Sequence, residues 1–362
     1  MVEIRDWLKL AVEKNASDLF IGAGQRVSFK IDGVIVPQSE NISTPDESEK
    51  MVMGLYETAR RPIDGYRKTG DDDFPVSVPG LARFRVCAYR QRGTMAAIIR
   101  VVLFGIPDHR ELNIPDEVME IANEKHGLVL VTGPAHSGKT TTLACIIDAI
   151  NKNRNCHIIT LEDPIEYLHR DNKSRISQRE IVTDTGSYIT ALRASLRQSP
   201  DIILLGEMRD FETIRTAMTA AETGHLVIST LHTSGVVNTL DRIIDVFPPS
   251  QQQQIRVQLS MVLQTTISQV LLPNKSGEQI PAFEIMHSNS GIRNLIRESK
   301  TYQIDSVIRS SASDGMISMD SYILKLLNSG EITEETAVGY AVNAEQMARR
   351  MGMPNRNEKH EG

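Results

Sequence analysis

Cysteine is scarce in this chain of 362 residues: Cys87, Cys145 and Cys156 stand alone, and no CxxC pair occurs. This spacing excludes a disulfide scaffold and a four-cysteine zinc site, and it is typical of a reducing compartment. The first residues, MVEIRDWLKL, lack the basic segment and long apolar core of a signal peptide. The most apolar stretch, Met95 to Ile106, is interrupted by Arg100 and is too short to span a bilayer. We therefore expect a soluble protein of the cytosol.

An excess of positive charge is also missing. The chain has 40 Lys plus Arg against 46 Asp plus Glu, a net charge of −6, so no overall basic field favours nucleic acid. Hydrophobic residues make up 40% and charged residues 24%, a globular mixture that excludes disordered, collagen-like and coiled-coil chains. The length is sufficient for two domains with cores of their own.

The first third of the chain predicts a small α+β domain. Apolar residues recur at helical spacing near the N-terminus, and alternating apolar residues flank two turn signals further on. The predicted elements are helices over residues 4–12 and 46–59 and hairpins over residues 27–36 and 83–102, turning at Asp32-Gly33 and Arg92-Gly93. The run Asp71-Asp72-Asp73 is expected to be a solvated loop.

The pattern changes after Ile106-Pro107, where short apolar runs alternate with helical segments. Such runs indicate a mostly parallel sheet that is buried on both faces. The expected strands cover residues 128–132, 157–161, 201–205 and 226–230, and the first two helices cover residues 115–125 and 141–150. We expect an N-terminal domain of residues 1–104, a hinge linker of residues 105–114 and an α/β domain of residues 115–362.

A phosphate-binding loop follows the first of these strands. The residues match the pattern GxxxxGK[ST] and run Gly133, Pro134, Ala135, His136, Ser137, Gly138, Lys139, Thr140. Glycines permit a tight turn whose amide hydrogens converge on a phosphate at the positive end of a helix. Lys139 is expected to pair with the β- and γ-phosphates and Thr140 to bind Mg²⁺ through its hydroxyl. The alternative is a glycine-rich turn without a ligand.

Acidic residues end two of the predicted strands. Glu162 and Asp163 follow one strand and Glu207 ends another, which places carboxylates at the edge of the sheet where ligands collect. One acid is expected to organise Mg²⁺ and another to orient or deprotonate the attacking water. For Glu162 and Asp163, a helix or turn cap is the alternative.

Histidines and arginines complete the set of candidate site residues. His225 and His232 flank one predicted strand, where each is either structural or a sensor of the γ-phosphate. Arg83 and Arg85 share one strand face and Arg100 lies on the partner strand. These arginines are either solvated or act as fingers across a subunit contact.

Several long stretches resemble the secretion ATPases of type II and type IV systems, and within them the PilT-type pilus retraction branch. The resemblance covers nearly the whole chain. Besides the phosphate-binding loop, it is carried by ITLEDPIEY from Ile159, the block from Leu196 to Thr233, VFPPSQQQQIRVQLS from Val246, GIRNLIRE from Gly291, and NASDLFIGAG near the N-terminus. The absence of CxxC favours the shorter retraction branch over zinc-bearing extension and secretion relatives.

The resemblance implies a RecA-like P-loop core, a PAS-like N-terminal domain and a homohexameric motor that hydrolyses ATP with Mg²⁺. It makes Glu166 the general base, Glu207 the Walker B acid, and the segment from Thr223 through His225 to His232 the histidine box. Arg83, Arg85 and Arg100 become trans-acting arginines. It further implies a pilus platform protein as partner, with the motor at the inner face of the cytoplasmic membrane and no nucleic acid.

Some residues depart from the family pattern. Ala135-His136 replaces Thr-Gly in the loop, where His136 is bulkier near the phosphates, and Thr141 follows Thr140. Phe20 and Ser199 replace a His and an Asp. Three different functions stay open: a RecA-like nucleic-acid motor, an extension or secretion ATPase, and an accessory subunit that binds nucleotide without hydrolysis.

Overall fold

The computed structural model describes residues 3–31, 33–102 and 105–352, which divide into two compact units. The N-terminal unit comprises the chain up to Gly105 together with the short segment Glu166–His169. The P-loop unit comprises Ile106–Ile165 and the chain from Arg170 onward. The inclusion of Glu166–His169 in the N-terminal unit is not foreseen by the sequence.

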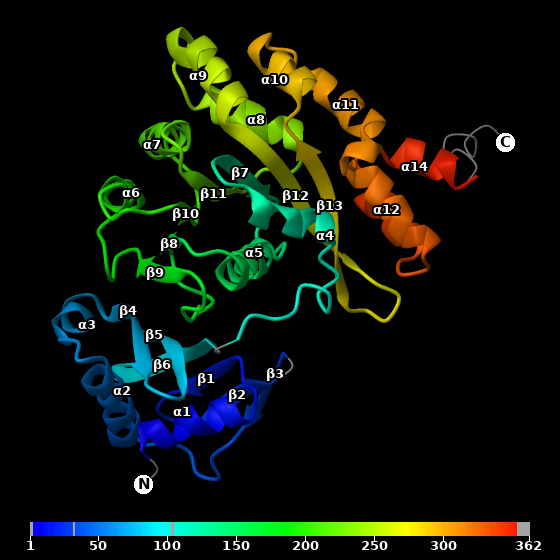
Figure 1. Ribbon diagram of the computed structural model, residues 1–362. Coiled ribbons are helices and arrows are strands. Elements are labelled where there is room, and N and C mark those ends of the chain that lie inside the picture. Colours follow the sequence, from blue (N-terminus) through cyan, green and yellow to red (C-terminus); the bar gives the residue numbers. More distant parts are fainter. Residues whose placement is uncertain (1–2, 32, 103–104, 353–362) are drawn as a thin grey trace. The chain divides into compact units, whose positions relative to one another are not determined.

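The N-terminal unit is a six-stranded antiparallel sheet with helices (Figure 1). Its order is β3-β2-β1-β6-β5-β4, with β1 Asp18–Ile21, β2 Ser28–Ile31, β3 Val34–Pro37, β4 Asp71–Val78, β5 Ala82–Gln91 and β6 Thr94–Val102. The helices are α1 Ile4–Glu13, α2 Pro45–Ala59 and α3 Asp64–Thr69. Leu8 of α1 and Leu55 of α2 pack with Phe29 and Phe84 of the sheet into one apolar core. At the start of α2, Thr44 and Glu47 form a reciprocal capping box.

Both predicted helices and both predicted hairpins of this unit are present. Gly33 follows β2, while its predicted turn partner Asp32 lies outside the described residues. The loop predicted for Asp71-Asp72-Asp73 is wrong, because these residues begin the edge strand β4. Cations stabilise this acidic strand, since Arg61 pairs with Asp72 and Arg85 with Asp73.

The P-loop unit is built on a seven-stranded sheet of order β13-β12-β7-β11-β10-β8-β9. All neighbouring pairs are parallel except β12 with β13. The strands are β7 Gly127–Thr132, β8 His157–Glu162, β9 Arg175–Glu180, β10 Ile202–Leu205, β11 Leu226–Leu231, β12 Leu263–Pro273 and β13 Gln279–His287. The α/β fold with a RecA-like core is therefore confirmed, and all four predicted strands are present.

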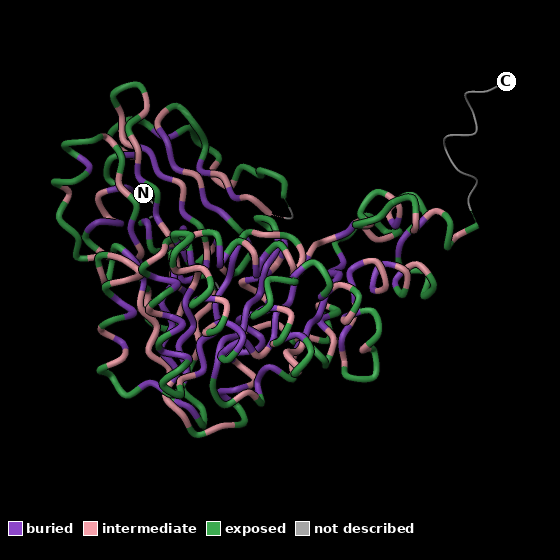
Figure 2. The backbone as a smooth tube through the Cα atoms, turned by 90° about the horizontal axis from the view of Figure 1, so that it is seen from above, coloured by how far each residue is buried: buried purple, intermediate pink, exposed green. Residues whose placement is uncertain are grey.

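Both faces of this sheet are buried, because alternate residues of β7 enter two different cores. In Figure 2 the buried backbone is purple and the exposed backbone green. Leu128 and Leu130 enter the core with α6 Tyr188–Ser195, α7 Phe211–Glu222, α8 Val236–Asp245 and α9 Pro249–Val262. Val129 and Val131 enter a second core with α4 Asp116–Met119, the 3₁₀ turn Glu120–Asn123, α5 Lys139–Asn153 and α12 Met319–Asn328. The helix predicted over residues 115–125 is thus α4 followed by a 3₁₀ turn.

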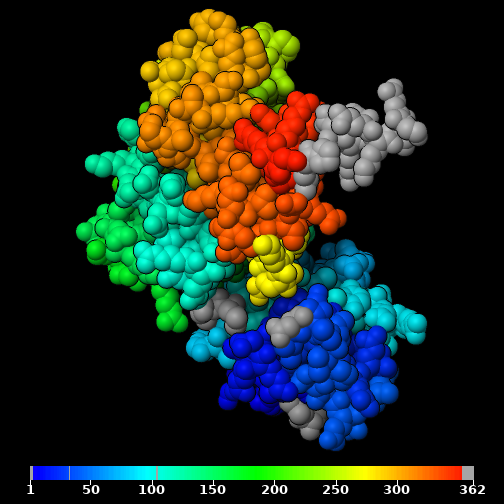
Figure 3. Space-filling view, turned by 90° about the vertical axis from the view of Figure 1, so that its right-hand side faces the viewer, coloured from blue at the N-terminus to red at the C-terminus, as the bar shows by residue number. Residues whose placement is uncertain are grey.

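The C-terminal helices extend the P-loop unit and form much of one surface (Figure 3). They are α10 Ser290–Arg297, α11 Ile304–Ser310, α12, α13 Glu334–Tyr340 and α14 Ala344–Arg350, with 3₁₀ turns at Thr301–Gln303 and Ala312–Asp314. None of the helices in residues 3–31, 33–102 and 105–352 combines the length and apolar character needed to cross a membrane.

Part of the predicted linker packs on the P-loop unit. Ile114 is buried in the core beside α5, and Ile106 and Leu112 pack against that core. These three residues of the predicted linker therefore belong to the P-loop unit.

Candidate active site

The phosphate-binding loop connects the buried strand β7 to the N-terminus of α5. Gly133 has φ 142° and Gly138 has φ 85°, and a Cβ atom added at Gly133 would lie 2.1 Å from the Gln269 carbonyl oxygen. Both positions therefore require glycine. The motif stands in the strand–loop–helix context that phosphate binding needs, with helix amides at its end.

Side chains of the loop are arranged around the position of an anion. Nζ of Lys139 donates to the carbonyl oxygens of Gly133 at 2.9 Å and of Pro134 at 2.7 Å. Oγ of Ser137 is buried without a hydrogen-bond partner in the described chain. A buried polar atom without a partner is costly, and a phosphate oxygen would supply the missing partner. The loop thus fits a phosphate group.

His136 and Ala135 are exposed, as is Pro134. His136 adopts φ 62°, a left-handed conformation that is unfavourable for residues other than glycine. Because His136 is exposed, its side chain is accessible to solvent. Thr140 and Thr141, in the first turn of α5, are half-buried.

Strand β12 supports the loop from behind, a contact that the sequence analysis missed. The side chain of Gln269 is buried, its Oε1 accepts a hydrogen bond from Thr142 Oγ1 at 2.8 Å, and its Nε2 lies 2.9 Å from where Gly138 would carry a Cβ. One glutamine therefore contacts α5 and the loop glycine together. A glutamine within the apolar run ISQVLL is the sequence signal that could have identified it.

The predicted acids lie at the carboxyl ends of neighbouring strands. Glu162 ends β8, where its Oε1 accepts hydrogen bonds from Thr160 at 2.5 Å and from Gln178 at 3.2 Å, and exposed Asp163 follows. Glu207 follows β10, and β8 and β10 are adjacent in the sheet. The structure thus brings these two carboxyl-bearing strand ends together, as predicted.

Tyr188, at the start of α6, is a further member of this cluster that the sequence analysis missed. Burial raises the pKa of its hydroxyl well above the usual range, and the nearby charges of Glu207, Asp163 and Glu162 raise this pKa further. The hydroxyl oxygen lies 2.7 Å from where Gly206 would carry a Cβ. Tyr188 therefore stays protonated near these carboxylates. No local pattern distinguishes it from other tyrosines.

Glu207 is the centre of a charged group. Its Oε2 lies 2.5 Å from Nε of Arg209 and 3.4 Å from Nε2 of His232, and its side chain is 13% exposed. His232 follows β11, the strand between β10 and the P-loop strand β7. Since neighbouring strands lie about 4.8 Å apart, this group stands roughly 5 to 10 Å from the P-loop strand.

His225 is not part of this group. It precedes β11, at the end opposite to His232, where its Nδ1 lies 3.0 Å from the Ala220 carbonyl oxygen and 3.3 Å from the Thr223 hydroxyl. The two histidines therefore lie at opposite ends of β11, His225 at its amino end and His232 at its carboxyl end.

The remaining predicted residues belong to the N-terminal unit. Glu166 is exposed and lies in the segment Glu166–His169. Arg85 pairs in register with Arg100 across β5 and β6, and Arg83 is two residues before Arg85 on the same face. Arg85 contacts Asp73, and Nε of Arg100 lies 3.1 Å from Oδ1 of Asp18. Either arginine would have to leave its carboxylate to serve another site.

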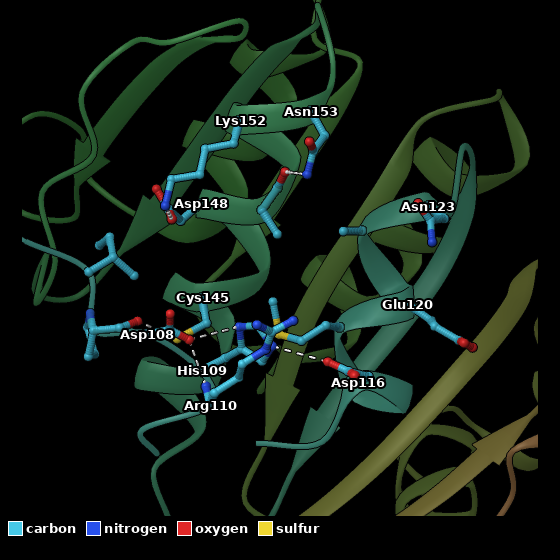
Figure 4. A pocket seen from close by; sticks show the side chains of 15 residues that line it. Asp108, His109, Arg110, Asp116, Glu120, Asn123, Cys145, Asp148, Lys152 and Asn153 are labelled. Carbon is cyan, nitrogen blue, oxygen red and sulfur yellow. Dashed lines mark hydrogen bonds and ion pairs between the residues drawn. The ribbon is translucent and has the colours of Figure 1, made fainter. Parts of the chain in front are cut away.

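A separate pocket of about 570 Å³ lies along α5 (Figure 4). Its walls are the segment from Ile106 to Arg110, the α4 region and the α5 residues Cys145, Asp148 and Lys152. Lys152 pairs with Asp148 at 2.6 Å, and His109 lies 3.3 Å from Asp116. No P-loop residue lines this pocket, so it is distinct from the phosphate-binding loop.

The oxygen donors near the loop fit Mg²⁺. The Thr140 hydroxyl and the Glu207 carboxylate are the hard ligands that this ion prefers, and it usually takes only one or two protein ligands beside phosphate and water. The described residues contain no group of three or more His, Cys, Asp and Glu side chains able to hold a metal by themselves.

Fold and site together define a P-loop nucleotide-binding protein with a RecA-like core. Residues 2–316 match the family model described as type II/IV secretion system protein, and the chain belongs to this family. It is 41% identical to the type IV pilus retraction ATPase PilT of Pseudomonas aeruginosa over 93% of this chain and 97% of that protein.

Two further comparisons agree. A twitching motility protein of Neisseria gonorrhoeae is 44% identical over 84% of this chain and 81% of its own length. The crystal structure of the pilus retraction motor PilT with bound ADP superposes with a TM-score of 0.88, at 41% identity, covering 96% of this chain and all of that one.

Proposed function

We propose that this protein is an ATP-hydrolysing motor that drives retraction of a type IV pilus, acting as a homohexamer. The observation that carries the proposal is the P-loop itself, where the buried Ser137 hydroxyl has no hydrogen-bond partner among the described residues, at the same end of the sheet as Glu207 and His232. The sequence identity to a pilus retraction ATPase over almost the full length of both chains supports retraction, not extension, of the pilus.

Binding of ATP is the first role of the site. The amides at the N-terminus of α5 and the ammonium group of Lys139 hold the phosphates. Thr140 and Glu207 would hold Mg²⁺, which when bound neutralises phosphate charge. Lys139 then exchanges its contacts with the loop carbonyl oxygens of Gly133 and Pro134 for phosphate oxygens.

Hydrolysis requires that a water be oriented and deprotonated. Glu166 is the general base of this proposal, while Glu207 orients the water and the neighbouring Glu162 and Asp163 add to the negative field. His232, through its contact with Glu207, responds to the γ-phosphate. Arg83, Arg85 and Arg100 act on the site of a neighbouring protomer and stabilise the charge of the transferring phosphoryl group.

Motion follows from the opening and closing of subunit boundaries. Closure brings the arginines of one protomer to the nucleotide of the next, and product release lets the boundary reopen. We propose the linker of residues 105–114 as the hinge, with the bend at its start, before Ile106 packs on the P-loop unit. The pilus platform protein at the inner face of the cytoplasmic membrane would receive the force.

A retraction motor and an extension ATPase predict opposite effects of gene deletion. Deletion of the gene for a retraction motor is expected to leave excess surface pili that do not retract, counted by electron microscopy. Deletion cells without surface pili would overturn the assignment as a retraction motor. Complementation with the wild-type gene should restore retraction, whereas Glu207→Gln should not, and Glu222→Gln, an exposed glutamate of α7, is the matched control.

Biochemical assays distinguish the hydrolysing pilus motor from a subunit that only binds nucleotide and from a nucleic-acid motor. Phosphate release by the purified protein would exclude the alternative of an accessory subunit that binds nucleotide without hydrolysis. Salt-sensitive DNA binding with stimulated hydrolysis would instead favour a nucleic-acid motor.

A further inference from the structure

Three threonine hydroxyls connect the P-loop strand to the loop that carries His232. Oγ1 of Thr239, in α8, lies 3.3 Å from Oγ1 of Thr132, the residue before Gly133. It also lies 2.8 Å from Oγ1 of Thr233, the residue after His232. The side chain of Thr239 is fully buried, so these contacts are shielded from water.

The hydrogen bonds in this chain have a consistent direction. Thr132 donates to the Ile267 carbonyl oxygen of β12 at 3.1 Å, which leaves its lone pairs available to Thr239. Thr239 has one proton, which it shares between two acceptors, the Gly235 carbonyl oxygen at 2.8 Å and the Thr132 hydroxyl at 3.3 Å. Its lone pairs then accept from Thr233. The hydroxyl of Thr239 is thereby fully used.

The loop after His232 is fixed at two further points. The backbone N–H of Gly235 donates to Oγ of Ser268 in β12 at 2.9 Å, and that of Val236 donates to Oε2 of Glu284 in β13 at 2.7 Å. Both acceptors are buried. The loop therefore has a definite position relative to the strands that support the phosphate-binding loop.

The His232 side chain depends on this support. It is 52% exposed, so packing does not hold it, and its contact with Glu207 is 3.4 Å long. The position of the imidazole therefore depends on the position of the loop that carries it. A shift of about 1 Å in a catalytic group is sufficient to lower a rate by up to about 100-fold.

We propose that Thr239 is a positioning residue for ATP hydrolysis: its hydroxyl couples the P-loop strand to the His232 loop and so keeps His232 on Glu207. This inference rests on the proposed ATPase function. Thr239 touches neither nucleotide nor water and acts through His232. Thr239 thus connects the strand that precedes the phosphate-binding loop to the loop whose His232 contacts Glu207.

The test is Thr239→Val, which removes the hydroxyl and conserves the shape of the side chain. We expect kcat for ATP hydrolysis to fall roughly 10-fold to 100-fold, with KM for ATP unchanged within about twofold. Thr239→Ser should restore kcat. Thr266→Val is the matched control, because Thr266 is a buried threonine of β12 whose hydroxyl has no partner within the described chain.

A double-mutant cycle separates positioning from a general loss of structure. In a His232→Ala background, Thr239→Val should lower kcat no further, since the group that it positions is gone. If the losses in kcat of the two single variants multiply in the double variant, the inference is overturned. It is also overturned if Thr239→Val raises KM and leaves kcat unchanged. Should Thr239→Val fail to fold, Thr233→Val breaks the same chain at its half-buried end and carries the same expectations.

The same assays distinguish failure of the inference from failure of the proposed function. If the wild type hydrolyses ATP, Glu207→Gln does not and Thr239→Val resembles the wild type, the ATPase assignment stands and the role of Thr239 is refuted. If the wild type releases no phosphate, both fall.

Discussion

Nε2 of His232 lies 3.4 Å from Oε2 of Glu207, so the ends of the adjacent strands β11 and β10 meet at one carboxylate. The same oxygen lies 2.5 Å from Nε of Arg209. Three chemical groups thus converge where the proposal places the Walker B acid. Arg209 and His232 both contact the carboxylate, which fixes its direction without a ligand.

Glu207→Gln is expected to abolish most of the ATPase activity while nucleotide binding persists. The amide retains the size of the side chain but lacks the negative charge that holds Mg²⁺ and orients the water, and such losses typically cost about 100-fold or more in kcat. Steady-state phosphate release and binding of a fluorescent ATP analogue measure the two effects. Activity near that of the wild type would remove Glu207 from the mechanism, and Glu222→Gln serves as the control.

Lys139→Ala is expected to act on binding instead. The ammonium group now contacts two loop carbonyl oxygens and would pair with phosphates in the complex. Loss of a charge-assisted contact of about 2 to 3 kcal/mol weakens affinity by roughly 30-fold to 150-fold. Titration with the fluorescent analogue measures this change. Lys152→Ala, at the far end of the same helix, should bind as the wild type does.

Mixed rings test whether arginines act between protomers. With ATP near the wild-type KM, the Arg83→Ala and Lys139→Ala proteins are each expected to have little activity alone. A random equal mixture should recover up to about a quarter of the wild-type rate, because an intact site then meets an intact arginine. Phosphate release after subunit exchange is the measurement. A mixture of Lys139→Ala with Glu207→Ala, which both damage the protomer's own site, should stay inactive. Equal inactivity of the first mixture would place Arg83 outside the neighbouring site.

The sequence predicts the phosphate-binding loop and the strand ends well, because continuous apolar runs mark buried parallel strands on either side of an unmistakable glycine pattern. It does not predict β9, whose residues RISQRE form a polar edge strand, or the pair β12 and β13, whose buried threonines, serine and glutamine interrupt the apolar pattern. Gln269 of β12 and Thr239 of α8 were also missed, for a different reason. Their importance depends on partners more than 100 residues away, which periodicity cannot reveal.

The position of His225 and the strand at Asp71 show a second limit. Two histidines that flank one strand look equivalent in the sequence, yet the six residues of β11 separate them by the whole length of that strand. An acidic run reads as a loop until the cations that neutralise it, here Arg61 and Arg85, are brought beside it by the fold.

Glu284 gives the protein a pH-dependent stability that one substitution should remove. Burial raises the pKa of this carboxyl from 4.5 to about 7; the hydrogen bond from the Val236 amide opposes the rise, and Asp305 and Asp320 add to it. A carboxyl with a raised pKa binds its proton more tightly in the folded chain. Its contribution to the free energy of unfolding is therefore fully present below pH 4.5 and is lost as the pH rises through about 7.

Glu284→Gln keeps an oxygen that can accept from the Val236 amide and removes the titration. One pKa unit corresponds to about 1.4 kcal/mol. The free energy of unfolding of the variant, minus that of the wild type, should therefore increase by roughly 3 kcal/mol between pH 4.5 and 7.5. Urea denaturation at a series of pH values measures the difference. Thr266→Val, which adds no titrating group, should differ from the wild type by a constant amount over this range. A Glu284→Gln curve that stays parallel to the wild-type curve would show that folding does not raise the pKa of this carboxyl.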